Sequence, residues 1–317
     1  MSSAPPLLFD RRLRRLRLDR AAPGFAGADF LFRRAAEDAA ERLSAILREF
    51  PLAVDLSARH GAFARALATS PAAARVGALI EADLSEKMLQ LSGRSNPEIV
   101  HRNIDAANPL RLVLDEERLP FAEASLDLVV SLLSLHWIND LVGALVQVRR
   151  SLKPDGLFVG AFLGGATLTE LRQSLIAAEA EVRGGAGLRV SPFADGIDAA
   201  GLLQRAGFAI PVADIDRVTV RYANPLKLMA DLRAMGETNA LVDRARTPLT
   251  RPVLARAFEI YAERFGLPDG RIPATFEIVT VTGGAPHESQ QKPLKPGSAK
   301  MRLADALGTV EHPLIPE

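Results

Sequence analysis

The fold is decided by the stretch Leu52-Ala53-Val54-Asp55-Leu56-Ser57-Ala58-Arg59-His60-Gly61, a short apolar run that ends in an acid and a turn. An apolar run of this length is typical of a strand buried on both faces of a parallel sheet. Comparable runs occupy 76–81, 127–132 and 157–162, and stretches with helical spacing separate them. This alternation predicts βαβ units and a doubly wound α/β fold.

The same patterns predict the domain organisation. We expect a basic arm over 1–29, one main α/β domain over 30–285 and an extended, proline-containing tail over 286–317. Within the main domain, 165–275 should insert helices between the last strands and cover the cleft. Helices are expected there near 225–235, 239–246 and 252–265, and Asp29 should cap an earlier helix that runs to Phe50.

Composition narrows the class of protein. The chain has 317 residues, a formal net charge of +1 and no Cys. The absence of Cys excludes disulfides, Cys-ligated zinc or iron–sulfur centres and Cys nucleophiles. The balanced charge argues against a nucleic-acid partner. Neither a long apolar segment nor a secretory h-region is recognisable, so we expect a soluble, intracellular protein: cytoplasmic in a bacterium, or in the mitochondrial matrix in a eukaryote.

The N-terminal arm carries six Arg between Asp10 and Arg20. Three interpretations of this run are open: a solvated helix, an arm that grips an acidic or protein partner, and a mitochondrial transit peptide.

Three acids follow predicted strands: Asp55, Asp83 and Asp115. Ligands of open parallel sheets bind at the carboxyl ends of strands, where an acid can accept both hydroxyls of a ribose and another can accept from an adenine amino group. This layout predicts an S-adenosylmethionine site; for each acid alone, a turn or a helix cap is the alternative. The expected cofactor-binding residues are Asp55, Ser57, Gly61, Asp83, Leu84, Asp115, Glu116 and Ser131.

The turn after the first strand departs from this pattern. Glycines normally let the backbone approach the ligand there, and only Gly61 is present. Ser57 and Ala58 are small, but Arg59 and His60 are bulky and could block or reshape the site.

His136 and Trp137 follow a later strand and are candidates for lining the substrate or cofactor. For Trp137 the alternative is a role in apolar packing. The His residues form no His-x-Asp/Glu pair, so we predict no metal site.

Several motifs resemble the family of complex I assembly factors with arginine hydroxylase activity, which have a methyltransferase-like fold and are distantly similar to the malonyl-carrier methyltransferases of the biotin pathway. The resemblance covers nearly the whole chain. It is carried by Phe9-Asp10-Arg11, Asp115–Phe121, Asp127–Trp137, Lys153–Gly156, Gly164–Leu168, Glu170–Arg172, Ser191–Phe193, Met235–Asn239, Pro273–Thr275 and His287–Gln290.

The resemblance implies a mostly parallel, seven-stranded sheet of class I methyltransferase type. It also implies a partner protein, a peripheral subunit of the membrane NADH:quinone oxidoreductase, on which the family hydroxylates an arginine near an iron–sulfur cluster. Any attachment to the membrane should then go through that partner. Since the resemblance includes the basic run, we expect this run to be part of the mature protein, which argues against a transit peptide. Relatives carry a Gly-Cys-Gly-x-Gly turn where this chain has Ser57–Gly61, which weakens the expectation of S-adenosylmethionine.

Glu237 and Asn239 are the remaining catalytic candidates, because a carboxylate and an amide could bind a guanidinium. The alternative is a turn between helices that Asn239 caps. Three functional classes therefore compete: an arginine hydroxylase or assembly enzyme for complex I, a methyltransferase acting on a protein or a small carboxylate, and a non-catalytic assembly chaperone with a degenerate cofactor site.

Overall fold

A seven-stranded sheet forms the centre of the computed structural model, with strand order β3-β2-β1-β4-β5-β7-β6. The structure describes residues 7–92, 110–193, 198–290, 301–302, 305–306 and 308–310. The strands are β1 Phe50–Asp55, β2 Val76–Asp83, β3 Arg111–Val113, β4 Leu126–Leu132, β5 Leu152–Leu163, β6 Ala209–Tyr222 and β7 Ile272–Gly284. Strands β1 to β5 pair in parallel, and β7 runs antiparallel to both of its neighbours.

This topology confirms the predicted doubly wound, mostly parallel fold. Strand β1 pairs with β2 on one side and with β4 on the other, so the strand order reverses there. Such a switch point is where open α/β sheets bind ligands, at the carboxyl ends of the strands.

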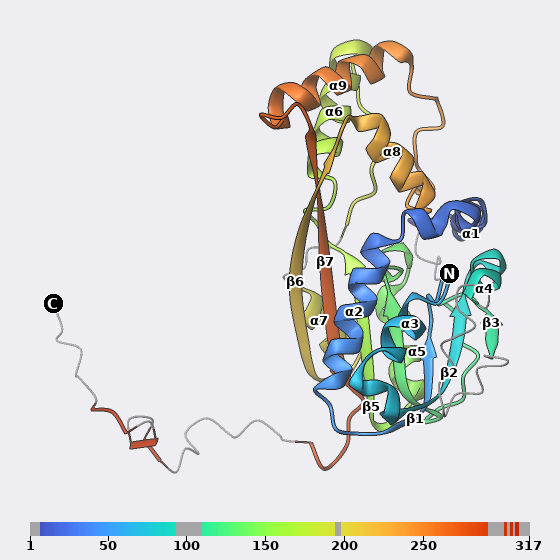
Figure 1. The fold of residues 1–317 in the computed structure, drawn as a ribbon, viewed down its shortest axis with the longest axis vertical. Coiled ribbons are helices and arrows are strands. Elements are labelled where there is room, and N and C mark those ends of the chain that lie inside the picture. Colours follow the sequence, from blue (N-terminus) through green and yellow to red (C-terminus); the bar gives the residue numbers. More distant parts are fainter. Residues whose placement is uncertain are drawn as a thin grey trace, which may run out of the picture. The chain divides into compact units, whose positions relative to one another are not determined.

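Helices cover both faces of the sheet (Figure 1). They are α1 Arg11–Ala21, α2 Phe30–Ser44, α3 Ala62–Ala68, α4 Glu86–Ser92, α5 Leu141–Ser151, α6 Thr169–Arg183, α7 Ala199–Arg205, α8 Pro225–Ala234 and α9 Arg251–Phe265, with short 3₁₀ turns η1 Ala22–Gly27, η2 Pro71–Arg75 and η3 Leu135–Trp137. Neighbouring residues of β1 show why the strand has to be apolar throughout. Ala53 packs into the core cluster with α2 and α3, whereas Val54 packs into the cluster with α5 and α7.

The helical insertion lies among the last strands. Helices α6 and α7 separate β5 from β6, and α8 and α9 separate β6 from β7. Strands β6 and β7 are long, and α6, α8 and α9 gather around one end of this pair in Figure 1. The insertion therefore faces the carboxyl edge of the parallel strands.

Two local expectations were wrong. Helix α2 ends at Ser44, and the Asp29 side chain makes no cap bond because it contacts His60 and Arg33 instead. No helix forms over 239–246, where the backbone of Leu241 pairs with that of Phe9 in an isolated antiparallel bridge. A long-range backbone pairing thus overrides the local helical pattern.

The N-terminal arm packs onto the main domain as α1. Asp10 caps this helix by accepting a hydrogen bond from the backbone N–H of Leu13 at 2.9 Å. Although α1 is rich in Arg, Arg14 and Leu18 are buried against the rest of the chain, and Phe9 packs edge-on against Trp137 with ring centroids 5.2 Å apart. This packing does not fit the interpretation of the run as a solvated helix.

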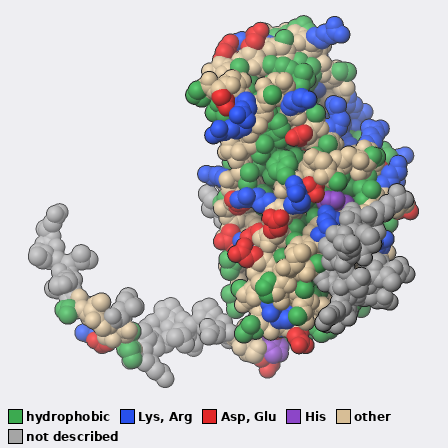
Figure 2. Space-filling view, viewed as in Figure 1, with side chains coloured by type: hydrophobic (Ala, Val, Ile, Leu, Met, Phe, Trp, Pro, Cys, Tyr) green, Lys and Arg blue, Asp and Glu red, His purple; other side chains and the backbone are tan. Residues whose placement is uncertain are grey.

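Within the described residues, no helix has the length and apolar character needed to cross a membrane. Figure 2 shows basic and acidic side chains interspersed on one face, in keeping with the net charge of +1.

Substitution of Gly236, which follows α8, tests whether α1 packs against this residue as the structure shows. Its backbone has a φ of +76°, and an added Cβ would lie 3.0 Å from Leu18 Cδ2. Gly270 has a similar φ of +77° but open space around it. Each Gly→Ala change should cost about 1–2 kcal/mol through the left-handed backbone. Gly236→Ala should cost about 1 kcal/mol more, because the core by Leu18 has to repack.

Denaturant unfolding of the two variants measures this difference. Limited proteolysis should also cleave α1 faster in Gly236→Ala than in Gly270→Ala. Equal losses of stability and equal cleavage rates in the two variants would contradict the described packing of α1 against Gly236.

Candidate functional site

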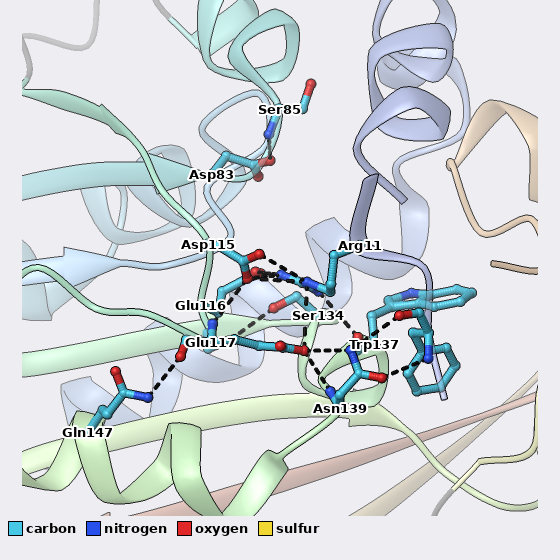
Figure 3. Close-up of polar contacts among 12 residues, drawn as sticks. Arg11, Asp83, Ser85, Asp115, Glu116, Glu117, Ser134, Trp137, Asn139 and Gln147 are labelled. Carbon is cyan, nitrogen blue, oxygen red and sulfur yellow. Dashed lines mark hydrogen bonds and ion pairs between the residues drawn. The ribbon is translucent and has the colours of Figure 1, made fainter. Parts of the chain in front are cut away.

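Most of the predicted cofactor residues meet at the switch point of the sheet. Asp55, Asp83 and Ser131 lie at or near the carboxyl ends of β1, β2 and β4, and all three are buried. Asp115 and Glu116 follow β3 at the same edge, beside α1 (Figure 3). The expected cluster of acids is therefore assembled, and its contacts decide what it can bind.

Asp83 is paired with an arginine of its own chain. Its Oδ2 accepts from the Arg59 guanidinium at 2.5 Å and from the Arg59 backbone N–H at 3.0 Å, and its Oδ1 accepts from the backbone N–H of Ser85 at 2.8 Å. The side chains of Arg59 and Asp83 are 1% and 0% exposed. Both oxygens that could accept ribose hydroxyls thus have partners within the protein.

The turn that carries Arg59 is fixed by the residues around it. Ser57 Oγ accepts from the backbone N–H of Leu132 and donates to its carbonyl, which ties the turn to β4. Arg59 itself has a φ of +51°, and its guanidinium lies 5.1 Å from the ring of Phe32. Gly61, with a φ of +78°, begins α3. The neighbouring Leu84 belongs to the core.

His60 is buried rather than on a loop surface. Its Nε2 lies 2.7 Å from Asp29 Oδ2, and its ring packs edge-on against Phe25. Burial and the charge of Arg65 lower the pKa of His60. His60 therefore links the altered turn to the start of α2.

Asp115 and Glu116 are paired with Arg11 of α1 (Figure 3). Arg11 Nη2 lies 2.6 Å from Asp115 Oδ1, also contacts Glu116, and the same guanidinium donates to the carbonyl of Trp137 at 3.2 Å. Burial by itself would lower the pKa of Arg11, but Glu116 and Asp115 raise it. The acids expected near an adenine thus hold the first turn of α1.

The loop after β4 is also held in place by hydrogen bonds to acidic and backbone groups. Asn139 donates to Glu117 Oε1 through its backbone N–H and its side-chain amide, and its Oδ1 accepts from the backbone N–H of Phe9. Ser131 Oγ lies 3.2 Å from Ser134 Oγ. These contacts explain why Phe9-Asp10-Arg11 and the stretch around Trp137 are placed together.

Glu237 forms a second buried cluster, which includes both aromatic candidates. Its Oε1 accepts from Arg14 Nη2 at 2.6 Å, and its Oε2 lies 2.9 Å from Trp137 Nε1 and 3.1 Å from His136 Nε2. Arg14 also donates to the carbonyl of Gly236, and its guanidinium carbon lies 4.4 Å from the centroid of the Trp137 ring. Glu237 and Trp137 thus form a complete guanidinium site, which Arg14 fills.

Electrostatics keeps this cluster in one charge state. Burial alone would raise the pKa of Glu237, but the charge of Arg14 and the hydrogen bond from His136 hold it at about 2. Burial lowers the pKa of His136, whose Nδ1 accepts from the backbone N–H of Leu163. The carboxylate is therefore ionised and His136 is neutral at pH 7, which suits Glu237 to binding a cation.

The side-chain amide and oxygen of Asn239 are both hydrogen-bonded to backbone groups. Its amide donates to the carbonyls of Leu188 and Arg189, and its Oδ1 accepts from the backbone N–H of Leu241. These bonds correspond to the alternative in which Asn239 holds a turn.

A cavity of about 200 Å³ lies beside Glu237. Trp137, Glu237 and Asn239 are on its wall together with Arg189 and Arg233, and the rest of the lining is mostly apolar. The apolar lining residues are Leu163, Leu168, Leu171, Leu175, Val190, Phe193, Met229, Leu232 and Leu249. Within the described parts of the chain, no group of three or more His, Asp or Glu side chains is placed to hold a metal ion.

Arg11 and Arg14 are the site residues that sequence reasoning missed, whereas Arg59 was expected to block or reshape the site. A signal existed for Arg11, which belongs to the motif at residues 9–11. Nothing in the sequence distinguishes Arg14 from its exposed neighbours Arg12 and Arg15.

Comparisons with known proteins relate the whole chain to methyltransferases and arginine hydroxylases. Residues 54–160 match the model of a methyltransferase domain. The chain is 40% identical to "Arginine-hydroxylase NDUFAF5, mitochondrial" of Danio rerio over 94% of this chain and 89% of that protein. It is 39% identical to the Homo sapiens protein of that name over 98% of this chain and 86% of that protein. A malonyl-[acyl-carrier protein] O-methyltransferase of Halorhodospira halophila is 36% identical over 86% of each chain.

Solved structures agree with the fold. The YcgJ protein of Bacillus subtilis covers 80% of this chain and 99% of its own with a TM-score of 0.53 at 16% identity. A phosphoethanolamine N-methyltransferase of Haemonchus contortus, solved with S-adenosylhomocysteine, covers 86% of this chain and 61% of its own with a TM-score of 0.50 at 16% identity. The chain thus has the methyltransferase fold, and this domain suggests an S-adenosylmethionine site.

The residues described here do not fit that cofactor in the present arrangement. Asp83 forms an ion pair with Arg59, and Asp115 and Glu116 form ion pairs with Arg11. A nucleoside would have to displace two buried or half-buried arginines before it could reach the acids.

Asp55 provides a pH test of the site. Burial, reinforced by Glu81 and Asp83, raises its pKa to about 8. A carboxyl with a raised pKa favours the folded state while it is protonated, so its contribution falls as pH rises from about 4 through 8. Asp55→Asn mimics the protonated form, and its stability relative to wild type should increase from pH 5 to pH 8 by up to about 1.4 kcal/mol per pH unit.

Urea unfolding across this pH range measures the effect, with Asp243→Asn at an exposed aspartate as the control. A stability difference for Asp55→Asn that stays constant with pH would show that Asp55 is ionised in the folded protein.

Proposed function

The chain belongs to the family of the NDUFAF5 arginine hydroxylases, and from that premise we propose that it acts in the assembly of respiratory complex I by binding an arginine of a partner subunit and hydroxylating it. The hydroxylation inserts one oxygen atom into a C–H bond of that arginine, so it needs an external oxygen-atom donor, either a peroxide or dioxygen together with two electrons. The partner is a peripheral subunit of the NADH:quinone oxidoreductase. The protein works in the compartment that this subunit faces, the cytoplasm of a bacterium, and reaches the membrane through the subunit.

One observation carries the proposal: the site around Glu237 already holds an arginine side chain. A buried carboxylate, the face of an indole and a backbone carbonyl surround the guanidinium of Arg14. These are the groups that bind guanidinium ions in proteins, by charge-assisted hydrogen bonds and cation–π contact. A substrate arginine would find the same three groups once α1 releases Arg14.

Exchange of one guanidinium for another makes this release feasible. Leaving a buried carboxylate without a partner costs about 3–5 kcal/mol. If the substrate arginine takes the place of Arg14, Glu237 remains paired before and after the exchange. The net free-energy change then depends on the contacts that the partner subunit makes elsewhere and on the cost of moving α1.

The cavity beside Glu237 gives the incoming chain a place to lie. Its apolar side chains, among them Leu171, Leu175 and Phe193, can cover the aliphatic part of an arginine or of a neighbouring residue. Neutral His136 holds the second oxygen of Glu237 and so orients the carboxylate toward the guanidinium.

The methyltransferase alternative rests on the domain match and on relatives that methylate a malonyl group on a carrier protein. It requires S-adenosylmethionine, and the pairing of Asp83, Asp115 and Glu116 with arginines counts against that requirement. The Glu237 cluster binds a cation, whereas a malonyl carboxylate is an anion. Both features favour an arginine substrate.

Mass spectrometry of complex I subunits tests the proposal. A deletion strain is complemented with wild type, Glu237→Gln or, as a matched control, Glu181→Gln, whose carboxylate pairs with Arg256 on the surface. We expect one arginine that gains a single oxygen atom with wild type and Glu181→Gln. Glu237→Gln should reduce this modification at least about tenfold, because a hydrogen bond to a charged group contributes about 1.5–3 kcal/mol.

Immunoblotting should confirm equal amounts of the three proteins. A gain of one methylene group instead of oxygen would support the methyltransferase alternative, and the absence of any modified arginine with wild type would contradict the proposal.

A further inference from the structure

We propose that Arg59 closes the cofactor position of the methyltransferase fold, so that this chain does not bind S-adenosylmethionine while Arg59 is in place. The inference goes beyond the proposed function, because it concerns the ligand that the sheet edge accepts and not the arginine site at Glu237. It assigns the block at Asp83, the carboxylate in the ribose position, to one residue. The acids of the adenine position pair instead with Arg11, on an N-terminal helix that another segment could displace.

The position of Arg59 in the turn is the first support. The turn after the first strand of a doubly wound fold is normally rich in glycine, because the backbone has to approach the ligand there. In this chain Arg59 lies in the middle of that turn, which runs from Ser57 to Gly61. Its backbone keeps the left-handed conformation that favours glycine, with a φ of +51°. The turn thus has a backbone shape that suits glycine, but a long side chain projects from it at the point where the backbone of such a turn approaches a ligand.

The contacts of that side chain are the second support. The Arg59 guanidinium and the Arg59 backbone N–H both donate to Asp83 Oδ2, and the other oxygen accepts from Ser85. With side-chain exposures of 1% and 0%, the pair leaves no open face on Asp83 for a ribose. The guanidinium also packs over the ring of Phe32, 5.1 Å from its centroid.

Charge is the third support. Burial alone would lower the pKa of Arg59, but Asp83, Glu116 and Glu237 raise it, so Arg59 is positively charged in the folded protein. S-adenosylmethionine carries a positive sulfonium. Bringing this sulfonium next to a buried arginine would add a like charge at low dielectric, which is unfavourable.

Calorimetric titration of the full chain with S-adenosylhomocysteine and S-adenosylmethionine tests the inference. Wild type should show no binding up to millimolar ligand. Arg59→Gly suits the left-handed backbone and frees Asp83, so it should bind S-adenosylhomocysteine with a micromolar Kd. Adding Asp83→Asn to this variant should weaken the gained binding at least about tenfold, since the ribose loses a charged acceptor.

Two controls keep the test decisive. Arg65→Ala removes an arginine that contacts His60 but not Asp83, and it should behave as wild type. Thermal unfolding shows whether each variant is folded, and Arg59→Ser replaces Arg59→Gly if the glycine variant is not.

Micromolar binding by wild type, or no binding by a folded Arg59 variant, would overturn the inference. Because the titration uses no partner subunit, its failure would leave the proposed arginine site untouched, and failure of the arginine site would not affect this result.

Discussion

The structure depends on how buried carboxylates at one edge of a sheet obtain partners. The fold brings the buried Asp83 and Glu116 and the half-buried Asp115 to the carboxyl ends of neighbouring strands, and Glu237 faces them from the helical insertion. Buried charges without partners are strongly destabilising. Here Arg59, Arg11 and Arg14 supply the compensating charges, and two of the three come from the N-terminal helix.

This arrangement makes α1 part of the site. Phe9 against Trp137, the Asp10 cap and the Arg11 pairs hold the helix over the sheet edge, and Arg14 then reaches Glu237. Leu18 and Ala21 pack α1 against the core, whereas Arg11 and Arg14 hold it through ion pairs. Another cationic segment could take over these ion pairs with little loss of pairing. The N-terminal arm therefore covers the site, and its Arg14 side chain occupies the position that we propose for the substrate arginine.

Sequence patterns predicted most of the fold, because strands buried on both faces require continuous apolar runs and β1, β2, β4 and β5 show them. Strand β3 was not predicted, since it has only three residues and is not buried. The acids could also be predicted, because the ends of strands can be recognised in the sequence and the topology of the sheet brings them together. The sequence pattern did not show which residues pair with these acids. Arg14 lies between exposed arginines, and its burial follows from the docking of α1 and from no local pattern. The helix expected over 239–246 failed because the backbone there pairs with Phe9, more than two hundred residues away in the chain.

The central claim is that Glu237 and Trp137 form a guanidinium site, and chemical rescue tests it most directly. Arg14→Ala should lower thermal stability, and millimolar ethylguanidinium should restore it by binding the folded protein, whereas ethylammonium should not. Arg12→Ala, at an exposed position of α1, should respond to neither. Selective rescue of Arg14→Ala is the predicted result. Equal effects of the two cations, or equal effects on the two variants, would contradict the account.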